Sequence, residues 1–215
     1  MSQTNNSGHP KGLYVLFATE MWERFNYYGM RAILIYFMTD ALLFSKPFAS
    51  QLYGGYTSLV FLTPLIGGFI ADRYWGNRNS IIVGGLIMAL AELILFFCSS
   101  MYKSSPEISG ILFYVGLGAM IVGNGFFKPN ISTLLGNVYT TPEFQDKKDE
   151  GYNIFYMGIN VGAFICNFFG AALYTTIGWG AAFMAAGVGM FIGVITFIAG
   201  TKHYKEFDTR KPLQP

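Results

Sequence analysis

The stretch LYVLFATEMWERFNYYGMRAILIYFMT, residues 13–39, decides the fold because it is long and apolar enough to cross a membrane yet carries four charges. It exceeds the roughly 20 residues that span a hydrocarbon core of about 30 Å. Five further apolar runs of similar length follow, at 50–71, 79–100, 108–135, 152–173 and 179–200. Together these runs predict an all-α membrane protein with six transmembrane helices.

Composition supports the membrane class and argues against several others. The chain of 215 residues is 53% hydrophobic and only 12% charged, which is too apolar for an ordinary water-facing surface. A net charge of +2 gives no reason to expect nucleic-acid binding. Cys98 and Cys166 lie inside apolar runs, and His9 and His203 lie in the tails. The sequence therefore offers no metal site and no nucleophile beside a base, and we do not expect an enzyme.

The distribution of basic residues predicts the orientation. With the N-terminus inside, the cytoplasmic segments hold nine of them: Lys11, Arg73, Arg78, Lys147, Lys148, Lys202, Lys205, Arg210 and Lys211. The external loops hold only Lys46 and Lys103. By the positive-inside rule, this imbalance places the N-terminus in the cytoplasm. Three basic residues fall within the spans, namely Arg24, Arg31 and Lys128, and need a separate explanation.

The charges of the first span share one helical face. At about 100° per residue, Arg24 and Arg31 lie within about 40° of Glu20, and Glu23 lies about 60° to the other side. An ionised residue at mid-span costs about 2.5–3.5 kcal/mol on insertion scales, whereas each Leu, Ile, Val or Phe returns about 0.3–0.6. The apolar residues of this span cannot offset four charges on that scale. The stripe must therefore face other helices or a water-filled cavity.

Lys128 is the expected partner of this stripe. Glu23 lies about 15 Å from the inner end of its span, and Lys128 lies about 12 Å from the same side on an oppositely directed span. Asn124 is one turn from Lys128 on the same face. Five ionisable groups are an expensive way to obtain stability alone, so we interpret the cluster as functional.

Two other polar features stay open at this stage. The fifth span carries a polar stripe that is as compatible with interhelical hydrogen bonding as with a binding site: Asn153, Tyr156, Asn160 and Asn167. Glu92 is alone in an apolar run, where a helix–helix contact is favoured over a proton site or an imprecise placement of the span.

Three motifs resemble one transporter family. Residues 20–29, EMWERFNYYG, resemble the E-x-x-E-R-F-x-Y-Y-G motif of the proton-dependent oligopeptide transporter (POT/PTR) family within the major facilitator superfamily. Residues 155–164, FYMGINVGAF, resemble that family's F-Y-x-x-I-N-x-G signature. Residues 67–78, GGFIADRYWGNR, resemble the superfamily's G-x-x-x-D-R-x-x-G-R-R loop, with Asn77 in place of a usual basic residue.

The resemblance implies a role for each matching residue. The proton-coupling cluster would be Glu20, Glu23, Arg24 and Lys128. The peptide would contact Arg24, Tyr27, Tyr28, Arg31, Lys128, Tyr156 and Asn160, with its carboxylate held by Arg31 and Lys128. Phe61 lies where many members have a tyrosine, which removes one possible hydrogen bond. The loop between the second and third spans would act in gating through Gly68, Asp72, Arg73, Gly76 and Arg78.

The resemblance also implies an architecture and an activity. Residues 13–200 would form the N-terminal six-helix bundle of a major facilitator fold, a 3+3 inverted repeat, between a cytoplasmic N-terminus (1–12) and the start of a linker (201–215) to a C-terminal bundle outside this chain. The activity would be proton-coupled symport of di- and tripeptides across the plasma or inner membrane, driven by the proton gradient without a cofactor. Two alternatives remain: the same fold carrying nitrate or another small anion, and a non-transporting membrane receptor or scaffold.

Overall fold

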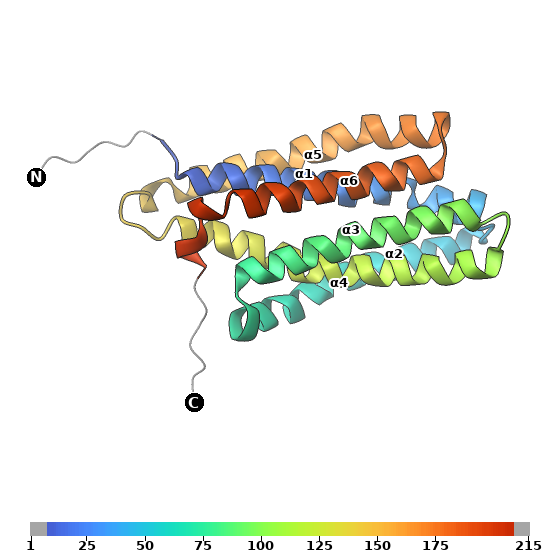
Figure 1. Ribbon diagram of the computed structural model, residues 1–215, viewed down its shortest axis with the longest axis horizontal. Helices are drawn as coiled ribbons and strands as arrows, with labels where there is room; N and C mark the ends of the chain where they lie inside the picture. The colour runs from blue at the N-terminus through green and yellow to red at the C-terminus, as the bar shows by residue number, and fades with distance from the viewer. Residues whose placement is uncertain (1–7, 209–215) are drawn as a thin grey trace, which may run out of the picture.

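The structure, a computed structural model, describes residues 8–208, and within them six long helices run side by side along one axis (Figure 1). Their bounds are α1 Lys11–Tyr36, α2 Lys46–Ile70, α3 Asn77–Met101, α4 Pro106–Val138, α5 Lys148–Thr176 and α6 Trp179–Ala199. Each of the six predicted spans coincides with one of these helices, and most of the helices extend a few residues beyond the apolar runs. Two π-helical turns, Phe37–Ala41 and Ala71–Trp75, prolong α1 and α2.

The connections between helices use residues with restricted or unusual backbone geometry. Pro47 and Pro106 lie in the first turns of α2 and α4, where a missing N–H has no partner to lose. Gly76 (φ +79°) directly precedes α3, and Gly178 (φ +128°) directly precedes α6. Both values lie in the left-handed region that a side chain disfavours. The short connections therefore make consecutive helices run in opposite directions.

The packing of the helices repeats after three. Helix α1 packs on α5 and α6, α4 packs on α2 and α3, and α3 packs on α6. Exchanging α1 with α4, α2 with α5 and α3 with α6 maps these five contacts onto one another. The arrangement agrees with the predicted 3+3 division of the bundle.

Helix α4 approaches α2 and α3 closely because glycines line both contacts. A Cβ on Gly84 would lie 2.6 Å from the carbonyl oxygen of Gly123, and one on Gly67 would overlap the backbone of Gly125. Gly68, the glycine that matches the superfamily loop, has ordinary room, with Pro129 Cβ 3.7 Å from its added Cβ. Small residues let helix backbones meet directly within a membrane bundle.

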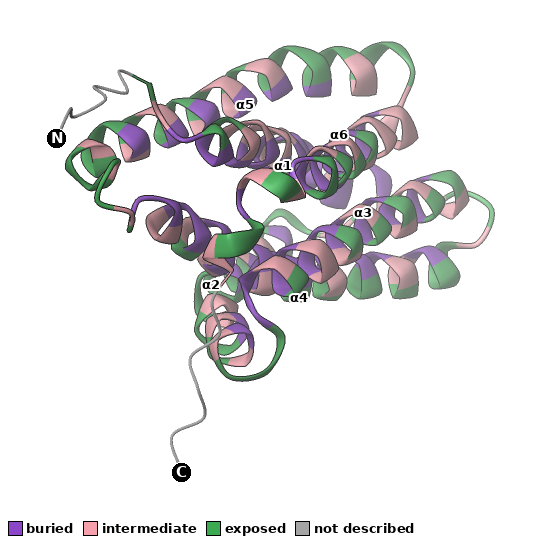
Figure 2. Ribbon diagram, turned by 60° about the vertical axis from the view of Figure 1, so that its left-hand side comes forward, coloured by how far each residue is buried: buried purple, intermediate pink, exposed green. Residues whose placement is uncertain are grey.

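The buried residues of the bundle face its interior, and the exposed residues lie on its outer side (Figure 2). Many of the exposed residues are large and apolar. Large side chains such as Leu65, Ile111 and Phe164 are more than half exposed. Among the described helices, five are long and apolar enough to cross a membrane, and α1 does not meet that criterion. The four charges between residues 20 and 31 explain why α1 differs.

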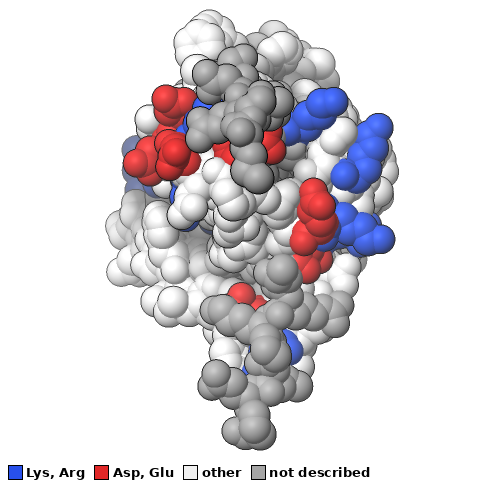
Figure 3. Space-filling model, turned by 90° about the vertical axis from the view of Figure 1, so that its left-hand side faces the viewer, with Lys and Arg blue, Asp and Glu red and all other residues white. Residues whose placement is uncertain are grey.

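Charged side chains gather at the end of the bundle where α1 begins and α6 ends (Figure 3). Residues 201–208, where the expected linker starts, pack against this end. Tyr204 is fully buried, and the Asn137 side chain donates a hydrogen bond to the Phe207 carbonyl. The backbone N–H of Arg78 donates to Asp208 Oδ1 at 3.1 Å. Residues 209–215, with the remainder of the expected linker, and residues 1–7 lie outside the described part.

Candidate functional site

Helices α1 and α4 bring four ionisable side chains into one buried cluster. The Lys128 ammonium contacts Glu20 Oε1, and Arg24 Nε lies 3.3 Å from the same oxygen. Arg24 also binds Glu23 through two hydrogen bonds, one of 2.6 Å from Nη2 to Oε1. Both carboxylates are fully buried, and Arg24 is 7% exposed. Two negative and two positive groups thus compensate one another inside the bundle.

The expected pairing between Lys128 and the stripe is present, but its partner is Glu20 rather than Glu23. Glu23 instead accepts a hydrogen bond of 3.2 Å from Asn124 Nδ2. The Lys128 side chain is long enough to reach a partner one helical turn away from the depth of its own Cα. The depths of the Cα atoms in the membrane therefore could not decide between Glu20 and Glu23, which lie on one face. Asn124 was expected on the same face of α4 as Lys128, and its side chain lies beside Glu23.

Aromatic rings cover the cationic side of the cluster. The Arg24 guanidinium lies 5.0 Å from the ring centroid of Tyr27 and 5.7 Å from that of Tyr28. Such cation–π contacts add to the ion pairs in holding a guanidinium in place. Tyr27 is 3% exposed, so its ring also fills the space between the helices.

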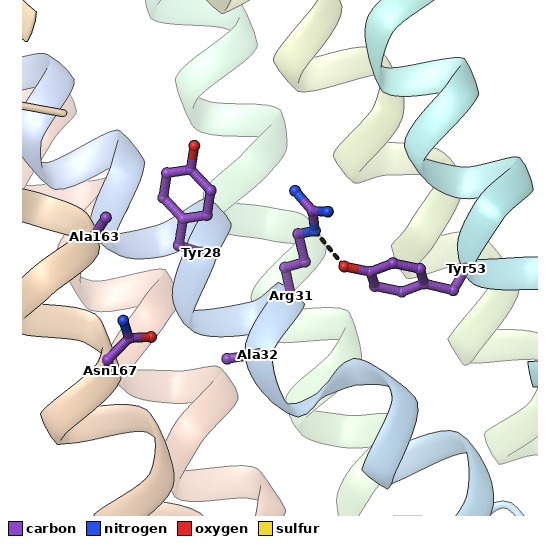
Figure 4. Close-up of a pocket in the computed structure, with 6 residues that line it drawn as sticks. All are labelled: Tyr28, Arg31, Ala32, Tyr53, Ala163 and Asn167. Carbon is purple, nitrogen blue, oxygen red and sulfur yellow. Dashed lines mark hydrogen bonds between the residues drawn. The ribbon is translucent and has the colours of Figure 1, made fainter. Parts of the chain in front are cut away.

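Two adjoining cavities open beside the cluster and share Tyr28 and Arg31. The larger has a volume of about 390 Å³, and the smaller has about 140 Å³. The smaller is lined by Arg24, Tyr27, Tyr28, Arg31, Val60, Phe61, Pro64, Asn124 and Lys128. The larger is lined by Tyr28, Arg31, Ala32, Tyr53, Ala163 and Asn167 (Figure 4). Cations and tyrosines dominate the polar lining, so the combined space suits an anionic group on a small polar ligand.

Tyr53 is a site residue that the sequence analysis missed. Its hydroxyl accepts a hydrogen bond from Arg31 Nε, and its ring lies 5.4 Å from the Arg31 guanidinium carbon (Figure 4). This contact aims Arg31 across the larger cavity. Tyr53, Val60 and Pro64 recur at i, i+7 and i+11 along α2 and all line these cavities, but Val60 and Pro64 are apolar, so the pattern gave no sequence signal for a binding face.

The predicted residues on α5 and α2 are only partly gathered at the cavities. Asn167 lines the larger cavity, and Phe61, 74% exposed, lines the smaller one. Tyr156 and Asn160 are exposed on α5 and do not line either cavity. Their helical spacing identified a common face but could not say how far along the bundle the cavity extends.

From Asp72 onward the loop motif lies at the charged end of the bundle, whereas Gly68 lies on α2 beside Pro129. Gly76 provides the positive φ that starts α3. The Arg73 guanidinium lies 5.9 Å from the Phe69 ring, and the Arg78 backbone binds Asp208. The structure thus links this loop to the segment after α6 and does not bring it to the buried cluster.

A family model described as the POT family matches residues 78–213 of the chain. The chain belongs to the POT family. It is 39% identical to an "Uncharacterized transporter YclF" of Bacillus subtilis, over 88% of this chain and 37% of that protein. It is 34% identical to a "Di-/tripeptide transporter" of Lactococcus lactis subsp. lactis, over 97% of this chain and 41% of that protein.

Solved structures of POT transporters share this fold. A crystal structure of a peptide transporter POT in complex with sulfate matches with a TM-score of 0.86 and 35% identity, covering 97% of this chain and 42% of that one. A POT family transporter in complex with 5-aminolevulinic acid matches with a TM-score of 0.86 and 30% identity, over 100% of this chain and 43% of that one. The chain therefore spans less than half the length of the POT proteins it matches. It is a multi-pass membrane protein with a bundle of the major facilitator fold.

Proposed function

We propose that this bundle forms one side of a proton-coupled symporter of di- and tripeptides. The observation that carries the proposal is the position of Lys128, which contacts the buried Glu20 carboxylate and also lines a cavity with Arg31. One cation thus has access both to a buried carboxylate and to the space where a ligand would lie. The names of the relatives support peptides as the substrate class.

The charge balance of the cluster provides a coupling mechanism. Glu20 and Glu23 are compensated by Arg24 and Lys128. When a peptide carboxylate attracts Lys128 toward Arg31, the cluster loses one positive charge. A proton on Glu20 restores the balance, so proton binding and peptide binding favour each other. The proton gradient is the driving force in this mechanism, and no cofactor takes part.

Contacts to the rest of the peptide follow from the cavity lining. Tyr27 and Tyr28 border the smaller cavity beside Arg24 and would contact the peptide backbone. Tyr156 and Asn160 of α5 are exposed beyond the cavities, and they would meet a longer ligand or the facing side of the transporter. We assign the peptide amine to a second six-helix bundle that rocks against this one in alternating access. The loop from Gly68 to Arg78 would control that movement.

The orientation follows from the charged end of the bundle. Among the described residues, Lys11, Arg73, Arg78, Lys147, Lys148, Lys202 and Lys205 belong to the segments at that end, whereas Lys46 and Lys103 lie at the other. By the positive-inside rule, the end with more cations faces the cytoplasm. The membrane that holds the protein is then the plasma or inner membrane of the cell.

The test is uptake of a labelled dipeptide by proteoliposomes that contain the complete protein. We expect accumulation above the external concentration only with an inward proton gradient, and its loss in Lys128→Gln. Unlabelled peptide should compete, and nitrate should not. Accumulation that survives collapse of the gradient would refute proton coupling, and competition by nitrate alone would indicate the anion carrier instead.

A further inference from the structure

Glu92 is a buried carboxyl group that the cluster on α1 and α4 does not include. It lies well inside α3 and is fully buried where α3 meets α6. The contact is close, because a Cβ on Gly187 of α6 would lie 3.0 Å from Glu92 Cβ. Its position near the middle of the helix excludes a misplaced span as the reason for a charge there. The residue is thus held in a packed junction of membrane helices.

One neutral amide is the hydrogen-bond partner of Glu92. Asn26 of α1 donates from Nδ2 to Glu92 Oε1 at 3.1 Å and to the Ala186 carbonyl of α6 at 3.0 Å. Glu92 Oε2 and Asn26 Oδ1 are buried without a hydrogen-bond partner. Asn26 Oδ1 can only accept a hydrogen bond, and the same holds for Glu92 Oε2 when the carboxyl group is ionised. An ionised Glu92 therefore leaves two buried acceptors unsatisfied at the same junction.

The charges around Glu92 do not compensate it. Within residues 8–208, no Lys, Arg or His side chain forms an ion pair with it, and Arg24 and Lys128 serve Glu20 and Glu23. Its contacts with α1 and α6 include the Asn26 amide and a close approach to Gly187, and neither of these carries a charge. On α2 the buried Tyr56 hydroxyl, which has no hydrogen-bond partner, lies within electrostatic range of it and carries no positive charge. A lone carboxylate in such surroundings costs several kcal/mol or more.

We propose that Glu92 is a second proton-binding site, occupied in the conformation described, with the proton on Oε2 donated to Asn26 Oδ1. One proton from water then satisfies both unpaired acceptors and removes the uncompensated charge. The carboxylic acid and the carboxamide form a closed pair of hydrogen bonds, Asn26 Nδ2–H to Oε1 and Oε2–H to Oδ1. This site is separate from Glu20 and Glu23, and it does not depend on which substrate the protein carries.

The partner of Glu92 ties this site to the first cluster. Asn26 follows Glu23 by three residues on α1, so the two side chains move together when α1 moves. Release of the proton requires water or a cation to reach Glu92, which needs α1 to move away from α3 and α6. The proton on Glu92 thus stabilises the arrangement in which α1 stays packed against α3 and α6.

The experiment is infrared spectroscopy of the purified complete protein at about pH 7, well above the ~4.3 at which an ordinary glutamate titrates. The difference between wild type and Glu92→Gln should contain the C=O stretch of a protonated carboxylic acid. The control variant, Glu107→Gln, alters an exposed glutamate of α4 and should leave that band in place. Asn26→Leu removes the hydrogen bond to Oε1 and should move the band to higher frequency.

The outcomes separate clearly. Loss of a carboxylate band instead of a carboxylic acid band in Glu92→Gln would overturn the proposal. If Glu92→Gln does not fold, the band in Asn26→Leu decides the matter: a shifted acid band supports the pair, and an unchanged spectrum overturns it. Because this readout does not involve transport, it stands whether or not peptides prove to be the substrate.

Discussion

Replacing Lys128 with glutamine tests the charge balance of the buried cluster most directly. The substitution removes one of two cations and leaves the fully buried Glu20 carboxylate without its partner from α4. Removing one member of a buried ion pair destabilises a protein by about 3–5 kcal/mol. The Lys128 side chain is 29% exposed, so we expect the lower end of that range, about 3 kcal/mol.

The assay is equilibrium unfolding of the complete protein in mixed detergent micelles, with the double variant Glu20→Gln/Lys128→Gln as the matched control. The double variant removes both charges, and we expect it to recover at least about 1.5 kcal/mol relative to Lys128→Gln alone. A single variant within about 0.5 kcal/mol of wild type, with no recovery in the double, would refute the compensation described here.

Two further predictions concern the cavity and the packing. Tyr53→Phe removes the hydrogen bond that Arg31 donates to the tyrosine hydroxyl. We expect KM for dipeptide uptake to rise about tenfold, which corresponds to about 1.4 kcal/mol, with little change in stability. An unchanged KM in the uptake assay would show that Arg31 does not need this contact. Gly84→Ala places a Cβ 2.6 Å from the Gly123 carbonyl oxygen and should cost about 3 kcal/mol of stability, whereas Gly68→Ala should cost far less. Equal midpoint temperatures of thermal denaturation for the two variants would contradict this packing argument.

The sequence was sufficient to predict the helices because apolar runs of membrane length carry a strong signal. It also predicted that the stripe on α1 faces other helices or a water-filled cavity, because its charges cannot face lipid. Glu20, Glu23 and Arg24 are indeed buried, and Lys128 of α4 joins the stripe as expected, although it pairs with Glu20 rather than Glu23. In each case one physical constraint left only one acceptable environment.

Residues whose position depends on the packing between helices were harder to predict. Tyr53 binds Arg31 only because α2 lies beside this part of α1, and the rotation of α2 about its own axis does not follow from its apolar composition. Tyr156 and Asn160 share a face of α5, yet helical spacing does not state which part of that face borders a cavity. Glu92 remained open because its environment consists of a single amide from another helix.

Helix α1 connects all of these contacts, which explains why the charged stretch lies where it does. At residues 20–24 it meets Lys128 of α4, at Asn26 it meets α3 and α6, and at Arg31 it meets Tyr53 of α2. Each of these contacts is polar, and each loses its partner if α1 moves by a few ångströms. Ion pairs and hydrogen bonds inside a membrane bundle have discrete arrangements, because a buried polar group that leaves one partner needs another. The polar residues of α1 therefore favour a few defined positions of this helix, and under the proposed function the charge on the cluster and the ligand beside it would select among them.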